Sequence, residues 1–264
     1  MLKEINGIQI AYTDVGEGSP LLFVHGFPLS RGTWSKQVAG FKAHHRVIAP
    51  DLRGLGESAS SPGPVAMSRF AEDLYALMQR LATGPVVLVG HSMGGYVALA
   101  FAKAYPKALR GLVLVGTKAG KDSPEAAAAR RATAEKVRAE GVSVVVDAMA
   151  PKMLSPGHDD PAMVSLVRGF MAGSRPEGVI GALQGMADRP DATAWLEQIR
   201  VPTLVITGTD DAIIPPSESA ALAQSIPGAK LQSIPKAGHL VAFEQAEAFN
   251  AGLSNWLTSE KATQ

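Results

Sequence analysis

Ser92 lies at the centre of a short glycine-rich motif whose spacing suits nucleophilic chemistry. Residues 90–94 read Gly-His-Ser-Met-Gly, a G-x-S-x-G pattern that is a weak signal alone in a chain with 27 glycines. Its context strengthens it, because a strand pattern at Val86–Val89 precedes it and a helix pattern at Gly95–Tyr105 follows. Such a junction predicts a strained turn that exposes the serine hydroxyl, with the helix N-terminus favouring developing negative charge. An ordinary glycine-rich turn is the alternative interpretation.

A serine hydroxyl becomes a nucleophile only when a base accepts its proton, and histidine is the usual base. His239 is the favoured one of six histidines, because it follows an apolar segment at Lys230–Ile234 and precedes the last helix pattern. Open α/β sheets place their sites in loops at such strand ends. The other five are interpreted as structural or surface residues: His25 and His91 beside strands, His44 and His45 before a strand, and His158 in a polar loop without a second histidine for a metal.

The base in turn needs a carboxylate that fixes its tautomer and stabilises the imidazolium. Asp210 and Asp211 directly follow the strand pattern at Thr203–Thr207, at the same predicted edge of the sheet as His239. One aspartate is expected to face His239, while the other accepts loop N–H groups or caps the next helix. Spacing alone leaves both assignments open.

The elements around these residues alternate between strand and helix. Asn6-Gly7 lies between two short alternating segments and is a strong hairpin signal. Helix patterns at Met67–Leu81 and Met93–Tyr105 lie between short apolar runs, which suit parallel strands buried on both faces. The alternation predicts a mostly parallel, doubly wound α/β sheet. The apolar runs are 20–25, 46–50, 85–90, 109–115 and 202–207.

One stretch interrupts this alternation. Residues 118–200 contain helix patterns at Glu125–Glu140, Pro161–Gly173 and Glu177–Ala187, without a convincing buried strand. We therefore expect an inserted helical cap at 118–200, with the core formed by 1–117 and 201–264.

Composition excludes several classes of function. The chain has 264 residues, 46% of them hydrophobic, and a net charge of +1, which indicates neither nucleic acid nor an anionic membrane as a partner. It contains no cysteine, so disulfides and thiol nucleophiles are excluded. No apolar run reaches the ~20 residues of a membrane span, and no leader pattern is evident, so a cytoplasmic location is expected. The sequence indicates no metal, no cofactor and no particular oligomeric state.

Five segments together resemble the α/β-hydrolase superfamily, from about residue 2 to 257. Within it the chain is most similar to small serine esterases grouped with cofactor-free haloperoxidases, perhydrolases and enol-lactonases. The resemblance implies that the acid is Asp211, the first residue of a D-x-I-x-P pattern. The segments are Gly90-His-Ser-Met-Gly-Gly95, His25-Gly-Phe-Pro28, Asp51-Leu-Arg-Gly-Leu-Gly-Glu-Ser58, Asp211-Ala-Ile-Ile-Pro215 and Gly238-His239.

The resemblance also implies an oxyanion hole made of the backbone N–H groups of Phe27 and Met93. It assigns Asp51 and Arg53 to a structural turn, in which relatives usually carry histidine at the position of Leu55. Members that cleave carbon–halogen bonds or epoxides use aspartate at the position of Ser92. Serine there implies an acyl-enzyme and hydrolysis of esters or lactones, without a metal or cofactor.

The cap is expected to supply an adaptable apolar pocket, because it contains five methionines and Phe170. An uncharged or weakly polar ester of short to medium acyl length is therefore the expected substrate. Pro28 is shared with perhydrolases and suggests a perhydrolase side activity. A carbon–carbon bond hydrolase and a ligand receptor that keeps the triad are the alternatives. Some of the five methionines, Met149, Met153, Met163, Met171 and Met186, are expected to join the cap to the core, and one or two to face the substrate. Residues expected to line the pocket are Pro28, Met149, Met153, Phe170 and Met171.

Overall fold

The computed structural model describes residues 1–158 and 160–260. Within them the core is one eight-stranded sheet of order β1-β2-β4-β3-β5-β6-β7-β8. Only the pairs β1–β2 and β2–β4 are antiparallel. The strands are β1 (Leu2–Ile5), β2 (Ile8–Val15), β3 (Pro20–Val24), β4 (Arg46–Pro50), β5 (Val86–His91), β6 (Leu109–Val115), β7 (Thr203–Gly208) and β8 (Lys230–Ile234).

The helices alternate with the strands as the sequence predicts, which confirms the mostly parallel α/β architecture. Short 3₁₀ turns occur at Arg31–Trp34, Pro106–Ala108, Ala150–Lys152 and Thr193–Gln198. The α-helices are α1 (Ser35–Phe41), α2 (Met67–Leu81), α3 (Met93–Ala104), α4 (Pro124–Glu140), α5 (Ser143–Met149), α6 (Pro161–Ala172), α7 (Pro176–Ala187), α8 (Pro216–Ser225), α9 (Val241–Glu244) and α10 (Ala246–Ser259).

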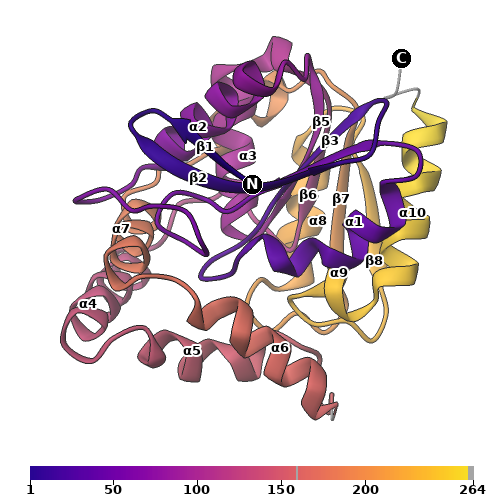
Figure 1. The fold of residues 1–264 in the computed structure, drawn as a ribbon. Coiled ribbons are helices and arrows are strands. Elements are labelled where there is room, and N and C mark those ends of the chain that lie inside the picture. The colour runs from indigo at the N-terminus through magenta and orange to yellow at the C-terminus, as the bar shows by residue number, and fades with distance from the viewer. Residues whose placement is uncertain (159, 261–264) are drawn as a thin grey trace.

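Strand β3 shows why the sheet is buried on both faces. Leu22 and Val24 point to one face and join a cluster with helices α2 and α3. Leu21 and Phe23 alternate with them and join a second cluster with α1 and α10. Figure 1 shows these two helical layers on opposite sides of the sheet. Continuous apolar runs in the strands are the consequence, because neither face meets water.

Helices α4 to α7 follow one another between β6 and β7 and form the lower part of the molecule in Figure 1. Val137 of α4 and Leu183 of α7 belong to the same buried cluster as the α2–α3 face of the sheet, so this region shares its core with the sheet. We keep 118–200 as the proposed cap, and 1–117 with 201–264 as the proposed core.

The sequence analysis missed α5. This helix contains three consecutive valines, whose β-branched side chains lower helix propensity. Burial of Val145 and Val146 against the neighbouring helices outweighs that local preference.

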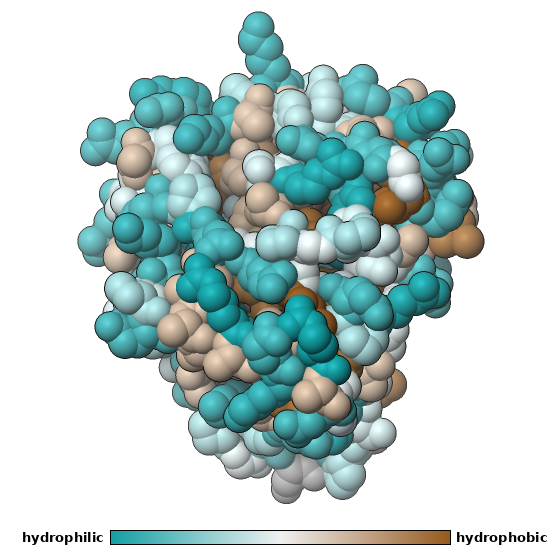
Figure 2. Space-filling model, turned by 90° about the vertical axis from the view of Figure 1, so that its left-hand side faces the viewer, coloured by the Kyte–Doolittle hydropathy of each residue, from teal (hydrophilic) through white to brown (hydrophobic). Residues whose placement is uncertain are grey.

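No helix in the described part of the chain is both long and apolar enough to cross a membrane. Figure 2 shows the face with α4 and α7, where hydrophobic residues form only small areas between hydrophilic ones. The exposed large hydrophobic side chains are scattered: Met1, Leu2, Val164, Leu166 and Leu231.

Candidate active site

Ser92 occupies the sharp turn between β5 and α3. Its φ of 53° and ψ of −114° lie in a region that L-residues rarely adopt, as expected for a strained turn. Two hydrogen bonds hold the turn: the Ser92 N–H donates to the Val115 carbonyl at 2.9 Å, and Thr117 Oγ1 donates to the Ser92 carbonyl at 2.8 Å. The strained turn is thus held by Val115, the last residue of β6, and by Thr117, which lies 25 positions after Ser92 in the sequence.

His239 and Asp211 form a buried pair at the same edge of the sheet. The His239 Nδ1 lies 2.8 Å from Asp211 Oδ2, and both side chains are almost fully buried. Asp211 Oδ1 accepts two further hydrogen bonds, from the N–H groups of Ile213 and Ile214, each at 2.9 Å. Burial alone would raise the pKa of Asp211, but His239 and these N–H groups lower it below its usual value. The carboxylate is therefore held ionised beside the imidazole.

This pair leaves the second ring nitrogen of His239 as an acceptor. Because Nδ1 donates to Asp211, the neutral ring carries no proton on Nε2. Nε2 is buried and has no hydrogen-bond partner among the described residues. A buried acceptor without a partner is costly and marks a place where another donor is expected.

Asp210 is directed away from this pair. It is exposed, and its Oδ1 accepts a hydrogen bond from Thr209 Oγ1 at 3.1 Å. Its N–H donates to the Ala237 carbonyl at 2.9 Å, which fixes the loop of His239. Asp211 therefore contacts His239 and Asp210 contacts Thr209, while the choice of Asp211 as the catalytic acid stays a prediction.

Gly116 is a residue of the site that the sequence analysis missed. It directly follows β6 with a φ of +50° and brings the main chain close to the pair. A Cβ here would lie 3.2 Å from Asp211 Oδ2 and 3.5 Å from His239 Nδ1. The first distance is shorter than an ordinary van der Waals contact, so a side chain at this position would press on the Asp211 carboxylate. The position of a glycine at the carboxyl end of a predicted strand was the available signal.

Two further histidines, His91 and His25, are buried at this edge of the sheet, and each makes hydrogen bonds to the main chain. The His91 ring lies 4.7 Å from the His239 ring, and its Nε2 donates to the His239 carbonyl at 2.9 Å. His25 accepts from the Leu52 N–H and donates through Nδ1 to the Gly26 carbonyl. Burial lowers the pKa of His91 to about 3 and also lowers the pKa of His25. Both rings are therefore neutral supports of the loops.

Two backbone N–H groups near Ser92 are without acceptors. Phe27 follows β3 and Met93 begins α3, and neither N–H donates to a protein acceptor within the described residues. Pro28 is buried and follows Phe27 through a cis peptide bond. These are the two donors that the sequence analysis expected for an oxyanion hole.

Asp51 and Arg53 have the structural roles that were expected. The buried Asp51 pairs with Arg31 and accepts the N–H of Glu57 at 2.9 Å. The buried Arg53 guanidinium pairs with Asp73 through two contacts of 2.7 Å. Neither contacts Ser92 or His239.

Four of the five predicted pocket residues belong to, or pack against, one apolar cluster that includes Leu240, the residue after His239. Met153 and Met171 are completely buried in it with Leu240, and Met149 and Phe170 pack against it half-buried. The Phe170 ring contacts the Phe243 ring edge-on at 5.3 Å. In this arrangement the side chains join the cap to the core, and their contact with substrate stays a prediction, as it does for Pro28. Met163 packs against this cluster, whereas Met186 belongs to the cluster of the α2–α3 face.

The polar loop with His158 shows no metal-like arrangement. Its Nδ1 lies 3.3 Å from Glu244 Oε1, whereas Asp159 is outside the described residues. Among the described residues no group of three or more His, Cys, Asp or Glu could hold a metal ion.

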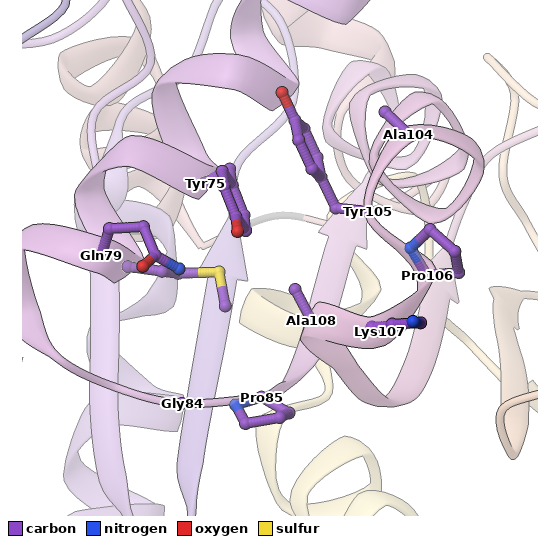
Figure 3. A pocket seen from close by; sticks show the side chains of 10 residues that line it. Tyr75, Gln79, Gly84, Pro85, Ala104, Tyr105, Pro106, Lys107 and Ala108 are labelled. Atoms are coloured by element: carbon purple, nitrogen blue, oxygen red, sulfur yellow. The ribbon is translucent and has the colours of Figure 1, made fainter.

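A cavity of about 470 Å³ lies at the opposite, amino end of the sheet. Gly84 and Pro85, just before β5, and Ala108, just before β6, form its floor, and Figure 3 shows Tyr75 and Tyr105 above them. None of its lining residues belongs to the cluster around His239. This cavity therefore does not coincide with the candidate active site, in spite of its volume.

The fold and the strained serine turn define a class of protein, and comparison with known proteins agrees with it. The family described as alpha/beta hydrolase fold matches residues 19–246, so the chain belongs to that family. The family predicted from the sequence is confirmed.

Solved structures of this family are closely similar. A thermophilic esterase from Thermogutta terrifontis with malate bound is 42% identical, and the match covers 100% of both chains with a TM-score of 0.96. An enol-lactonase from Burkholderia xenovorans is 28% identical with a TM-score of 0.91, covering 98% of this chain and 100% of that one. Among known proteins compared by sequence, a non-heme haloperoxidase from Rhodococcus erythropolis is 31% identical over 96% of this chain and 97% of its own.

Proposed function

We propose that this protein is a serine hydrolase that cleaves carboxylic esters or lactones through an acyl-enzyme. One observation carries the proposal: the His239 ring, oriented by Asp211, has a buried Nε2 without a partner, and it lies at the same edge of the sheet as a serine on a strained turn. The family and its esterase and enol-lactonase relatives support the same reaction class.

The proposed mechanism assigns each group one role. Ser92 Oγ attacks the carbonyl carbon while His239 Nε2 accepts its proton, and Asp211 stabilises the imidazolium. The N–H groups of Phe27 and Met93 donate to the oxyanion of the tetrahedral intermediate. Its collapse breaks the ester bond, and the alcohol leaves with the proton from His239. Water then attacks the acyl-enzyme by the same route, which releases the acid and restores Ser92.

The surroundings of the site favour a substrate without charge. Leu29, Met153, Met171 and Leu240 form a buried apolar cluster next to His239. The neighbouring cation Arg31 is paired with Asp51 and Glu57. An apolar wall accepts an acyl or alkyl chain and penalises a carboxylate or phosphate. We therefore propose an ester or lactone of short to medium chain length.

The test is a series of nitrophenyl esters and lactones of graded length, assayed with wild type and Ser92→Ala. A fluorophosphonate probe followed by peptide mass spectrometry should label Ser92 in the wild type. Hydrolysis lost in Ser92→Ala is expected. Cleavage restricted to carbon–carbon bonds of dienoate ketones, or a single turnover with ligand-driven movement of the cap, would replace the proposal with a carbon–carbon hydrolase or a receptor.

We further propose a perhydrolase side activity, which rests on Pro28 beside the donor Phe27. Hydrogen peroxide that attacks the acyl-enzyme through one oxygen keeps an O–H on its distal oxygen, a group that water lacks. A main-chain carbonyl of this loop would accept a hydrogen bond from that O–H, while His239 takes the proton of the attacking oxygen as it does for water. A preference of ~1.4 kcal/mol suffices for a tenfold change in the ratio. The perhydrolysis-to-hydrolysis ratio on one short acyl ester is expected to fall in Pro28→Leu; an unchanged ratio would remove Pro28 from the explanation.

A further inference from the structure

Glu244 is a buried carboxylate that the mechanism above does not use. It ends α9, and its side chain is only 1% exposed. Its partners come from two directions. On the core side, Oε2 accepts the Gly238 N–H at 2.7 Å. On the cap side, the Ser155 N–H lies 3.0 and 3.1 Å from the two oxygens, Ser155 Oγ also donates, and His158 Nδ1 lies 3.3 Å from Oε1.

The core-side partner is the residue immediately before His239. A second hydrogen bond fixes the residue immediately after it, because the Leu240 N–H donates to the Met153 carbonyl at 2.8 Å. Gly238 approaches the cap so closely that a Cβ would lie 2.5 Å from the Ser155 nitrogen. The main chain on both sides of His239 is thus held against the cap segment Met153–Ser155.

We propose that Glu244 is a positioning residue that makes docking of the cap and placement of the base a single event. This inference rests on the proposed function. The Glu244 carboxylate gathers donors from cap and base loop at one buried point, where such charge-assisted hydrogen bonds are strong. When they are intact, the main chain of 238–240 holds the His239 ring against Asp211. When the cap segment withdraws, Gly238 loses its partner and the ring loses its fixed orientation.

The decisive variant is Glu244→Gln. It keeps the size of the side chain but replaces one acceptor oxygen by an NH₂ group, which cannot accept a hydrogen bond from an N–H donor. At least one of the hydrogen bonds from Gly238 and Ser155 must therefore break. Misplacing a catalytic group by about 1 Å costs up to about 100-fold in rate, so we expect kcat to fall 10- to 100-fold with KM changed less than about threefold. The acid limb of the pH profile of kcat/KM should also move, because the contact between His239 and Asp211 is altered.

Two companions make the test specific. Glu247→Gln changes an exposed glutamate in the following helix and should leave kcat, KM and the pH profile unchanged. Ser155→Ala removes only the Oγ–H donor from the cap arm, so a smaller fall in kcat is expected. If the hydrogen bonds to Ser155 and to Gly238 act through the one Glu244 carboxylate, the two substitutions are not independent. The fall in kcat of the double variant Glu244→Gln/Ser155→Ala should then be smaller than the product of the two single falls.

A merely structural Glu244 would give another result. Glu244→Gln would then unfold at a lower temperature yet keep wild-type kcat and an unmoved pH profile below that temperature, which would overturn the proposal. If Glu244→Gln does not fold, an unchanged kcat and pH profile in Ser155→Ala would overturn it equally. Titration of the His239 Cε1 proton by NMR reads the ring directly. A shifted midpoint in Glu244→Gln supports the inference even if wild type hydrolyses no ester, so its failure and that of the proposed function are distinguishable.

Discussion

The two ends of the parallel sheet differ in what they offer a ligand. The amino end has a cavity of about 470 Å³ in which the Tyr75 and Tyr105 rings stack 4.1 Å apart. What distinguishes the carboxyl end is chemistry: a strained Ser92, a buried Asp211–His239 pair and an unpartnered Nε2. Sites in open α/β sheets lie at this carboxyl end. The comparison teaches that unsatisfied buried polar atoms, rather than empty volume, identify the candidate site here.

The largest effect is expected from Ser92→Ala, which tests whether the carboxyl end is the site at all. Loss of the nucleophile of a triad lowers kcat by about 10⁵- to 10⁶-fold, whereas the fold should persist because alanine fills the same turn. Esterase assays with matched circular dichroism spectra measure both quantities. Residual activity within about tenfold of wild type would place the chemistry elsewhere.

The next effect separates two adjacent carboxylates. Asp211→Asn should lower kcat by about 10⁴-fold, because an amide can hold His239 in the wrong tautomer. Asp210→Asn changes an exposed side chain and should stay within about threefold of wild type. The measurement is kcat of both variants on the same ester. Similar falls in kcat for the two variants would contradict the assignment of Asp211 as the partner of His239.

These two aspartates also show how far sequence reasoning reaches. Local patterns predicted the hairpin at Asn6-Gly7, the bounds of α2 and the serine turn, because each depends on residues close in the chain. The choice between Asp210 and Asp211 depends on which side chain faces a residue 28 positions later, and only the resemblance indicated it.

Other features of the site were beyond the sequence for the same physical reason. Glu244 is one acid in an ordinary helical pattern until the fold brings Ser155 to it from 89 positions away. Gly116 is one of 27 glycines until β6 ends against His239. Helix α5 contradicts its local propensity because tertiary packing decides it. Contacts distant in the chain leave no periodicity to detect.

A third effect concerns stability, since the carboxyl end contains a histidine that must stay neutral. The folded-state pKa of His91 is about 3, below the usual 6.5, so the unfolded chain binds more protons between these values. The contribution of His91 to the free energy of unfolding is therefore fully present above about pH 6.5 and is lost progressively as the pH decreases towards 3. We expect the free energy of unfolding to drop by about 2–3 kcal/mol between about pH 7.5 and about pH 4.5.

Urea unfolding at the two pH values measures this difference. His91→Gln removes the titrating group and should show a smaller drop, although it is less stable at neutral pH because it perturbs the contact with the His239 carbonyl. His44→Gln, at an exposed position, should retain the full drop. An equal drop in His91→Gln and wild type would assign the acid sensitivity to other groups.

The smallest effect is expected at the amino end, and it bears most directly on the comparison between the two ends. Tyr105→Ala removes the ring that stacks on Tyr75 with an interplanar angle of 2°, and it enlarges the cavity. A half-buried aromatic pair contributes about 1–2 kcal/mol to stability, and the change lies far from Ser92, so kcat should stay within about twofold of wild type. Thermal unfolding and ester kinetics on one preparation measure both, with Lys107→Gln at the exposed rim as a variant expected to change neither. A tenfold fall in kcat with unchanged stability would show that the open cavity takes part in turnover, and chemistry at the carboxyl end alone would no longer account for the enzyme.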